Sequence, residues 1–281
     1  MSWDARVILD SISPAGRRIL TVELTYPRFI HAEVMTHRVL SRSAASNRAI
    51  PTKRLIEEVK NNPVIPVHFG KNKKGMAAVE EIEDRPLGVI RWLEARDAAV
   101  LAAQALADLG THKQLANRVL EPFQWITTIV TATRWAWLFK LRDHPDAQPE
   151  FQHLMKLLGA AIKNSKSEIR KLHTPYLREE EYQLPEDIRK KIAVARCARV
   201  SYLNRGEVRN YEEELSLFQK LLDGSGHGHW APLEHVATAM LNRNALSGNF
   251  HGWNQFRQES EGNYVSDIVE DEFFSLLGEP K

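Results

Sequence analysis

A run of thirteen residues, from Thr36 to Arg48, gathers side chains that bind anions. It contains three arginines, one histidine and four hydroxyl groups. Arginine offers a planar, permanently charged fork that matches phosphate, and serine adds a short hydrogen-bond donor. Ser46 and Arg48 lie ten and twelve residues beyond Thr36, so they suit a loop that folds back over a phosphate. The run predicts an anion site, unless its first cations only cap the C-terminal end of a helix over residues 27–40.

The sequence around this run predicts the elements that position it. Residues 18–26 carry apolar side chains in partial alternation, which favours a strand. Pro27 suits the first turn of a helix that runs toward His37. Residues 45–51 have the composition of a loop, and residues 52–61 that of a short helix. The anion-binding run is therefore expected where a helix gives way to a loop.

The remaining sequence predicts mostly helices. A helix over residues 86–109 has an apolar face typical of a core or a subunit interface, whereas residues 125–133 are rich in β-branched side chains, which favours a strand. Further helices are expected over residues 112–121, 135–142, 186–199 and 211–223, with a solvated loop over 71–75 and a boundary over 179–185.

The composition is that of a folded enzyme-sized chain. Its 281 residues are 43% apolar, enough for a large core in one domain or two closely packed ones. The formal net charge of +2 gives no strong field for nucleic acid, which argues against a DNA-coating protein. No run of about eighteen apolar residues occurs, and the N-terminus lacks the layout of a signal peptide, so neither membrane insertion nor export is expected.

The anion-binding run resembles the signature of the flavin-dependent thymidylate synthases, the ThyX family. That signature reads Arg-His-Arg, two residues, Ser, one residue, Asn-Glu, one residue, Ser, one residue, Arg-Tyr. Aligned without a gap, the chain matches it at His37, Arg38, Ser41, Ser46 and Arg48. It departs at Thr36, Ser43, Ala44 and Ala49, where the family has Arg, Asn, Glu and Tyr. In the family this segment touches the flavin and the nucleotide phosphate, so the departures bear on both ligands.

Two further segments are similar to the same family. Residues 118–122, Thr131 and residues 141–150 resemble the family's C-terminal stretch, with a two-residue gap before Thr131. Residues 195–202 and 229–235 resemble its N-terminal stretch. In ordinary members the histidine motif comes first, whereas here it comes last. The order indicates a rearranged, circularly permuted member, similar to versions from bacteriophages.

The resemblance implies an α+β fold, with a central, largely antiparallel sheet flanked by helices and a homotetramer whose sites draw on several subunits. Residues 1–180 would form the anion-loop and arginine-motif half, and residues 181–281 the histidine-motif half, packed into the same domain. It implies that NADPH reduces bound FAD, that methylenetetrahydrofolate gives its one-carbon unit, and that dUMP is methylated at C5 to dTMP. The expected location is the cytoplasm, or the host cytoplasm for a phage-encoded chain.

The resemblance also gives each candidate residue a role. Ser46, Arg48 and Arg142 are the candidate catalytic residues, and with Arg118 they are expected to bind the phosphate and uracil of the nucleotide. His37, Arg38, His229 and His235 are the candidate flavin-binding residues. Thr131 stands where the family usually has an Asn near the flavin. From the residues alone, Arg118 and Arg142 are equally cations at helix ends, and Gln148 and Glu150 a solvated helix start.

Three other features admit readings without catalysis. His227, His229 and His235 invite a zinc site, but no cysteine or carboxylate stands at convincing spacing, so no metal is predicted. Cys197 forms no internal disulfide and lacks the Pro-Cys-His setting of the cysteine-dependent thymidylate synthases, which predicts a small core or interface residue. Residues 247–257 mix glycines, aromatics and amides that suit either a stacked ring ligand or a core.

Two alternative functions stay open at this point. Ala44 in place of the family's Glu motivates a related pyrimidine nucleotide modifier, such as a hydroxymethylase. A non-catalytic derivative could instead bind nucleic acid through a basic patch of Arg38, Arg42 and Arg48, and such binding would fall steeply with salt. The absence of a Gly-x-Gly-x-x-Gly or Walker-type loop argues against a Rossmann or P-loop site.

Overall fold

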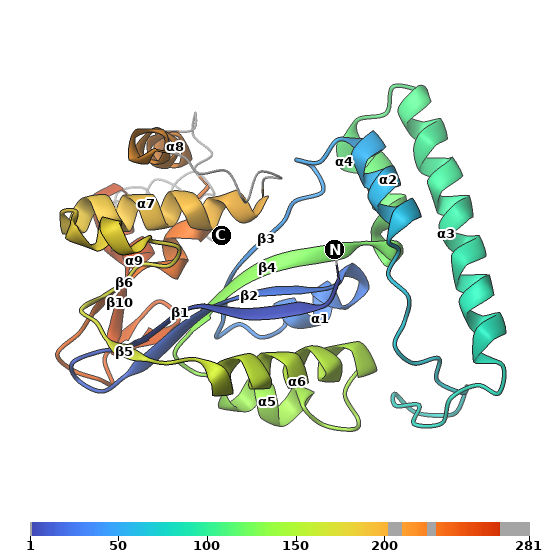
Figure 1. The fold of residues 1–281 in the computed structure, drawn as a ribbon, viewed down its shortest axis with the longest axis horizontal. Helices are drawn as coiled ribbons and strands as arrows, with labels where there is room; N and C mark the ends of the chain where they lie inside the picture. The colour runs from blue at the N-terminus through green and yellow to red at the C-terminus, as the bar shows by residue number, and fades with distance from the viewer. Residues whose placement is uncertain (1, 202–209, 224–228, 265–281) are drawn as a thin grey trace, which may run out of the picture.

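The central element is a mixed sheet of five strands in the order β3-β4-β2-β1-β5 (Figure 1). The computed structural model describes residues 2–201, 210–223 and 229–264. Its strands are β1 (Asp4–Ile12), β2 (Arg18–Pro27), β3 (Ser41–Ala44), β4 (Trp125–Ala132) and β5 (Glu168–Ile169). All neighbours pair antiparallel except β1 with β5. The predicted α+β class and largely antiparallel sheet are confirmed, as are the strands near residues 18–26 and 125–133.

The two middle strands bury both of their faces, and one of these faces is polar. Val22 and Leu24 point to the side covered by α5 (Ala136–Arg142) and α6 (Pro149–Asn164), where they pack with Phe151. Successive side chains of a strand point to opposite faces, so the buried Thr21 and Glu23 face the other side. That side carries α7 (Glu186–Ala198) and the segments that follow it. Buried polar groups require hydrogen bonds, and this polar face organises the candidate site.

A second group of helices stands at one end of the sheet (Figure 1). It comprises α2 (Thr52–Asn61), α3 (Arg85–Asp108), α4 (Lys113–Ala116) and the 3-10 segment η2 (Asn117–Phe123). Leu55, Val59, Val100 and Phe123 form its core. The predicted helices over 52–61 and 86–109 are confirmed, whereas the expected helix over 112–121 is a short α-helix followed by 3-10 turns.

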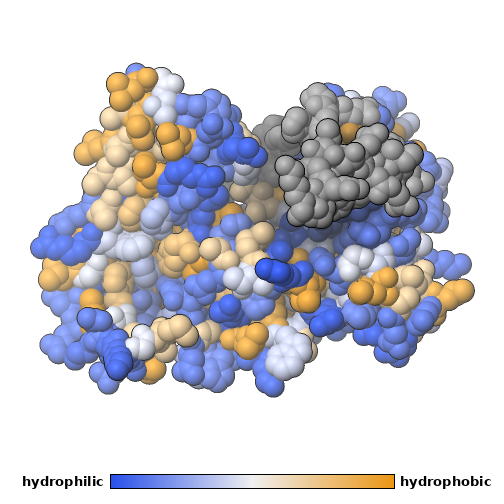
Figure 2. Space-filling model, turned by 180° about the vertical axis from the view of Figure 1, so that it is seen from behind, coloured by the Kyte–Doolittle hydropathy of each residue, from blue (hydrophilic) through white to orange (hydrophobic). Residues whose placement is uncertain are grey.

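Helix α3 is apolar on more than its packed side. Leu101 and Leu109 are 73% and 81% exposed, and Leu115 beyond the helix is 59% exposed. Figure 2 shows apolar side chains gathered over this end of the molecule. Exposed apolar side chains gathered on one surface can mark an interaction site, and the subunit interface expected here stays a prediction.

The C-terminal part of the chain folds onto the polar face of the sheet. It contains α8 (Tyr211–Asp223), the 3-10 segment η5 (Ala231–His235), a small sheet, a hairpin and α9 (Phe256–Tyr264). The small sheet has the order β10-β7-β6, made by Trp253–Gln255, Ala237–Ala239 and Leu172–His173, and the hairpin joins β8 (Leu246–Ser247) and β9 (Phe250–His251). Trp253 is fully buried, so the aromatics of residues 247–257 serve the core. The helices predicted near 186–199 and 211–223 are confirmed.

The segment between β2 and the anion-binding run differs from expectation. The predicted helix over 27–40 is only a 3-10 turn, η1 (Arg28–Ile30), and a short α1 (His31–Met35). The guanidinium of Arg42 donates to the carbonyl oxygens of Met35 at 2.7 Å and His37 at 3.1 Å. These bonds supply partners for carbonyl groups at the C-terminal end of α1, so the helix can end at Met35. Residues 41–44 form the strand β3, which was not expected, because they pair with β4. The expected loop over 45–51 follows it and contains no helix or strand.

The expected boundary over 179–185 is an ordered 3-10 segment, η3 (Glu179–Gln183). Glu181 is buried there and forms a two-pronged ion pair with Arg196 of α7. The segment is therefore fastened to the helix that follows it. Among the described residues, no helix is both long and apolar enough to cross a membrane.

Candidate functional site

The loop after β3 presents Arg48 to solvent on a fixed backbone. The Arg48 N–H donates to Ser46 Oγ at 3.3 Å, and the Ala49 N–H donates to the Ser46 carbonyl at 3.0 Å, which closes a turn. Next to it, Asn47 is buried and held by Glu121 and Asn117. The Arg48 side chain is exposed, and no described residue forms a hydrogen bond or ion pair with it. An arginine on a rigid turn without an internal partner is available for an anion.

His229 lies close enough to Arg48 for the two to interact electrostatically. Partial burial and the positive charge of Arg48 both lower the pKa of the His229 imidazole. Its backbone N–H donates to the Leu221 carbonyl at 2.9 Å, which ties this residue to the end of α8. The fold therefore joins the anion-binding run to the histidine motif, although the two are far apart in the sequence.

Arg118 is linked to the same loop through one carboxylate. Glu121 Oε1 accepts from Arg118 at 2.8 Å, from Asn47 at 3.0 Å and from Arg28 at 3.1 Å. The Arg118 side chain is 55% exposed, so its ion pair with Glu121 leaves donors open to solvent. Ser46, Arg48, Arg118 and His229 thus belong to one connected region.

His37 and Arg142 form a second group, on the α5 and α6 side of the sheet. Arg142 Nε donates to His37 Nε2 at 2.9 Å, its guanidinium lies 4.9 Å from the Phe151 ring, and Glu33 is 3.5 Å away. The pKa of His37 is lowered by burial first, then by Arg142 and Arg42, which favours the neutral ring that this bond requires. Arg38 beside it is exposed and, within the described ranges, has no ion pair or hydrogen bond.

His235 lies inside the protein rather than at its surface. The residue is 0% exposed, Nδ1 is bonded to Thr131 Oγ1 and Nε2 to Ser43 Oγ, both at 2.9 Å. Burial lowers the pKa of this imidazole to about 3, so the ring is neutral at pH 7. Both ring nitrogens are already occupied by protein groups, whereas no described residue bonds to the ring of the exposed His229.

Several residues that contact these candidates were not among the predicted site residues, although two of them lie in the cluster over 247–257. Gln255 donates to Ser41 Oγ at 3.0 Å and to the Glu234 carbonyl at 3.3 Å, which ties β10 to β3 and η5. Gly248, at φ +53°, is required beside it, because a Cβ there would lie 2.2 Å from the Gln255 side chain. His173 Nε2 is bonded to Thr21 Oγ1 at 2.8 Å, and Thr21 Oγ1 is bonded in turn to Thr131 Oγ1 at 2.7 Å. The clues in the sequence were the cluster over 247–257 and the departures from the family pattern at Ser43 and Thr131.

Glu150 and Cys197 are both buried inside the protein, away from solvent. Glu150 is 1% exposed and accepts from the Val67 N–H at 2.9 Å and from Gln148 at 2.8 Å, so it is not a solvated helix start. Cys197 is buried against Ile129, and burial raises the pKa of its thiol, which is the core position that the sequence predicts. The described part of the chain holds no cluster of three His, Cys, Asp or Glu residues for a metal, and His227 lies outside it.

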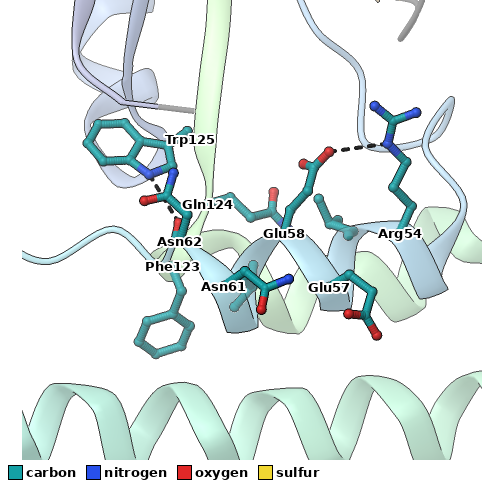
Figure 3. A pocket seen from close by; sticks show the side chains of 10 residues that line it. Arg54, Glu57, Glu58, Asn61, Asn62, Phe123, Gln124 and Trp125 are labelled. Atoms are coloured by element: carbon teal, nitrogen blue, oxygen red, sulfur yellow. Dashed lines mark hydrogen bonds and ion pairs between the residues drawn. The ribbon is translucent and has the colours of Figure 1, made fainter.

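A separate pocket of about 290 Å³ lies between α2, the end of η2 and the start of β4 (Figure 3). Its floor is apolar, with Leu55, Val59 and Phe123, and its rim carries the Arg54–Glu58 ion pair. Trp125 at one end donates to the Asn62 carbonyl at 3.2 Å. None of the predicted site residues lines this pocket, so it is distinct from the Arg48 region.

Comparison with known protein families gives a match to one family model. The family model described as "thymidylate synthase complementing protein" matches residues 12–165, which is more than half of the chain. The match includes the anion-binding run, Arg118 and Arg142, whereas the histidine motif follows it. No curated protein matches.

Two solved structures resemble the chain over part of its length. One is a UMP/dUMP methylase PolB from Streptomyces cacaoi bound with 5-Br dUMP, at 21% identity and a TM-score of 0.43, covering 52% of this chain and 66% of that chain. The other is the UMP/dUMP methylase PolB from the same organism bound with 5-Br UMP, at 17% identity and a TM-score of 0.44, covering 57% of this chain and 88% of that chain.

Proposed function

The chain belongs to the thymidylate synthase complementing protein family, and from this premise we propose that it methylates dUMP at C5 to give dTMP, with flavin as its cofactor. The proposed carbon donor is methylenetetrahydrofolate and the proposed reductant is NADPH. The observation that carries the proposal is that Arg48, which is exposed and has no partner among the described residues, lies within electrostatic range of His229 from the histidine motif. This proximity supports a shared anion site made by both family-like segments.

In this proposal the phosphate of the nucleotide binds at the turn after β3. The Arg48 guanidinium donates to phosphate oxygens, Ser46 adds a hydroxyl, and Arg118 adds positive charge from the neighbouring segment. Arg142, whose position is fixed by His37 and Phe151, lies in the second group, so it would orient the uracil ring from another subunit of the proposed homotetramer. These residues bind and orient, which is the task a protein performs when a cofactor supplies the chemistry.

The four flavin-binding candidates differ in how well they suit that role. Arg38 and His229 are exposed, so they offer donors to the phosphates and ring edge of a flavin. His37 is half-buried with Nε2 accepting from Arg142, which leaves only Nδ1 for a ligand. His235 is enclosed and fits a supporting role better than direct contact. When bound, the flavin would supply the hydride that completes the methyl group.

The contacts also support a permuted chain. In ordinary members the histidine motif precedes the arginine motif, and here the later motif packs back onto β3 through His235 and Ser43. Residues 1–180 and 181–281 would then be two parts of one domain, as the sequence suggests. A homotetramer is proposed on the same grounds, with the exposed apolar residues of α3 as a candidate interface.

The proposal is tested by the absorbance of the purified protein with and without added FAD, followed by titration with dUMP. The expected result is a bound-flavin spectrum whose bands shift as dUMP is added, since both ligands share the site. A flavin spectrum that ignores dUMP, or no retention of flavin at all, would contradict the proposal.

The nucleic-acid-binding alternative loses support from one contact. Arg42, one of its three arginines, points its guanidinium at the carbonyls of Met35 and His37. Arg38 and Arg48 remain exposed, which suits a small anion better than a long backbone.

A further inference from the structure

A buried chain of hydrogen bonds crosses the polar face of the sheet. It runs from Ser11 through His173, Thr21, Thr131 and His235 to Ser43, with successive distances of 2.9, 2.8, 2.7, 2.9 and 2.9 Å. All of its members are buried. A neutral imidazole has one N–H and one acceptor nitrogen, so each ring donates to one of its two hydroxyl partners and accepts from the other. Burial lowers the pKa of both histidines to about 3, which keeps the chain uncharged.

His235 is the point where this chain meets the candidate site. Its Nδ1 is bonded to Thr131 on β4, its Nε2 is bonded to Ser43 on β3, and the residue itself ends η5. Ser43 and Thr131 are also two of the positions at which the sequence departs from the family pattern. The two departures therefore hold the same ring, and that ring has no nitrogen left for a ligand.

The bond between His235 and Ser43 joins the two segments that lead to the candidate site, the strand β3 and the 3-10 segment η5. From Ser43 the chain runs out of β3 into the turn that carries Arg48, and η5 begins directly after His229 and Trp230. Gln255 joins the same two elements, because its side-chain amide donates to Ser41 Oγ of β3 and to the Glu234 carbonyl of η5. The edge strand β3 is only four residues long, so these contacts are a large part of what fixes it.

We infer that His235 is a positioning residue: through Ser43, its ring holds the β3 loop, which carries Arg48, against η5, which follows His229. The ring acts as a neutral bridge and does not touch the ligand. The inference concerns the geometry of the free protein, and only its effect on nucleotide affinity rests on the proposed function.

Two substitutions of His235 separate its two bonds. A glutamine amide reaches about as far as ring Nε2, so His235→Gln keeps a partner for Ser43 and loses Thr131. An asparagine amide reaches about as far as Nδ1, so His235→Asn keeps Thr131 and loses Ser43. Ser43→Ala removes the same bond from the other side with a smaller change, and it decides the question if His235→Asn fails to fold. Thermal unfolding identifies the variants that fold.

The readout is the pKa of His229, measured from its ring proton signals by NMR titration. In the wild type this pKa is depressed, partly by Arg48, and Arg48→Ala should raise it as a positive control. We expect His235→Asn and Ser43→Ala to raise it toward its ordinary value of 6.5, and His235→Gln to leave it depressed. Equal behaviour of the Asn and Gln variants, or an unchanged pKa in Ser43→Ala, would overturn the inference, because a role in stability alone does not distinguish the two bonds.

Titration with dUMP forms the second arm. Loss of the bridge should weaken dUMP binding about three- to tenfold in Ser43→Ala and His235→Asn, and less in His235→Gln. If the wild type shows no dUMP binding while the His229 pattern appears as expected, the proposed function fails and the bridge stands. If dUMP binds equally well to all the variants, the bridge has no part in nucleotide binding, and that part of the inference is overturned, whereas the His229 titration decides the geometry.

Discussion

The substitution Arg48→Ala tests the anion site at its most exposed member. No described residue pairs with the Arg48 side chain, so its removal leaves no buried group unsatisfied and should change the free energy of unfolding by less than about 0.5 kcal/mol. A hydrogen bond to a charged group contributes about 1.5–3 kcal/mol, and solvent screening favours the lower end for an exposed guanidinium. The expected loss of dUMP affinity is therefore about tenfold, since about 1.4 kcal/mol corresponds to a factor of ten.

The assay is isothermal titration of dUMP into wild-type protein and into the variant, at two salt concentrations. Arg54→Ala is the matched control, because Arg54 is a 50% exposed arginine of α2 held in an i,i+4 pair with Glu58. Arg48→Ala should also show a weaker salt dependence than the wild type, since it has one charge fewer to be screened. An unchanged dissociation constant for dUMP, with Arg54→Ala equally silent, would remove Arg48 from the site and refute the reasoning.

Three further predictions follow from burial and exposure. Cys197→Ala should leave the turnover of the folded enzyme unchanged, because the thiol is buried in the core; loss of turnover in a protein of normal melting temperature would contradict this. His173 and His235 have folded pKa values of about 3, below the ordinary 6.5, so the unfolded state binds more protons than the folded state. The free energy of unfolding should therefore fall as the pH drops from 6.5 toward 3, by up to about 2.7 kcal/mol per pH unit for the two rings together. Urea unfolding at pH 7 and pH 5 measures this change, and equal free energies of unfolding would argue against buried neutral rings. Leu101→Glu on the exposed face of α3 should lower the mass measured by light scattering if that face joins subunits, and an oligomer of unchanged mass would place the interface elsewhere.

The elements with a strong local pattern could be predicted from the sequence. Residues 52–61 form α2 with the expected bounds, and β2 and β4 begin within a residue of their predicted starts. The strand β3 could not be predicted, since its sequence Ser-Arg-Ser-Ala has neither β-branched residues nor apolar alternation. It exists because it pairs with β4 and is held by residues near the other end of the chain.

The candidate site was predictable in its residue types but not in its contacts. The sequence pointed to Arg48 and His229, and the fold brings these two together. It did not distinguish His229, which is exposed, from His235, which is enclosed by Ser43 and Thr131. Such partners come from distant strands, and only the packing of η5 on the sheet joins them.

The central claim is methylation at C5 of dUMP, and product identification tests it most directly. The protein would be incubated with FAD, NADPH, dUMP and methylenetetrahydrofolate labelled with carbon-13 in its one-carbon unit, with UMP and dCMP in parallel reactions, and the nucleotides analysed by mass spectrometry. The account predicts dTMP that carries the label, formed only when both FAD and NADPH are present. A labelled hydroxymethyl nucleotide, or unmodified dUMP in the complete mixture, would contradict it.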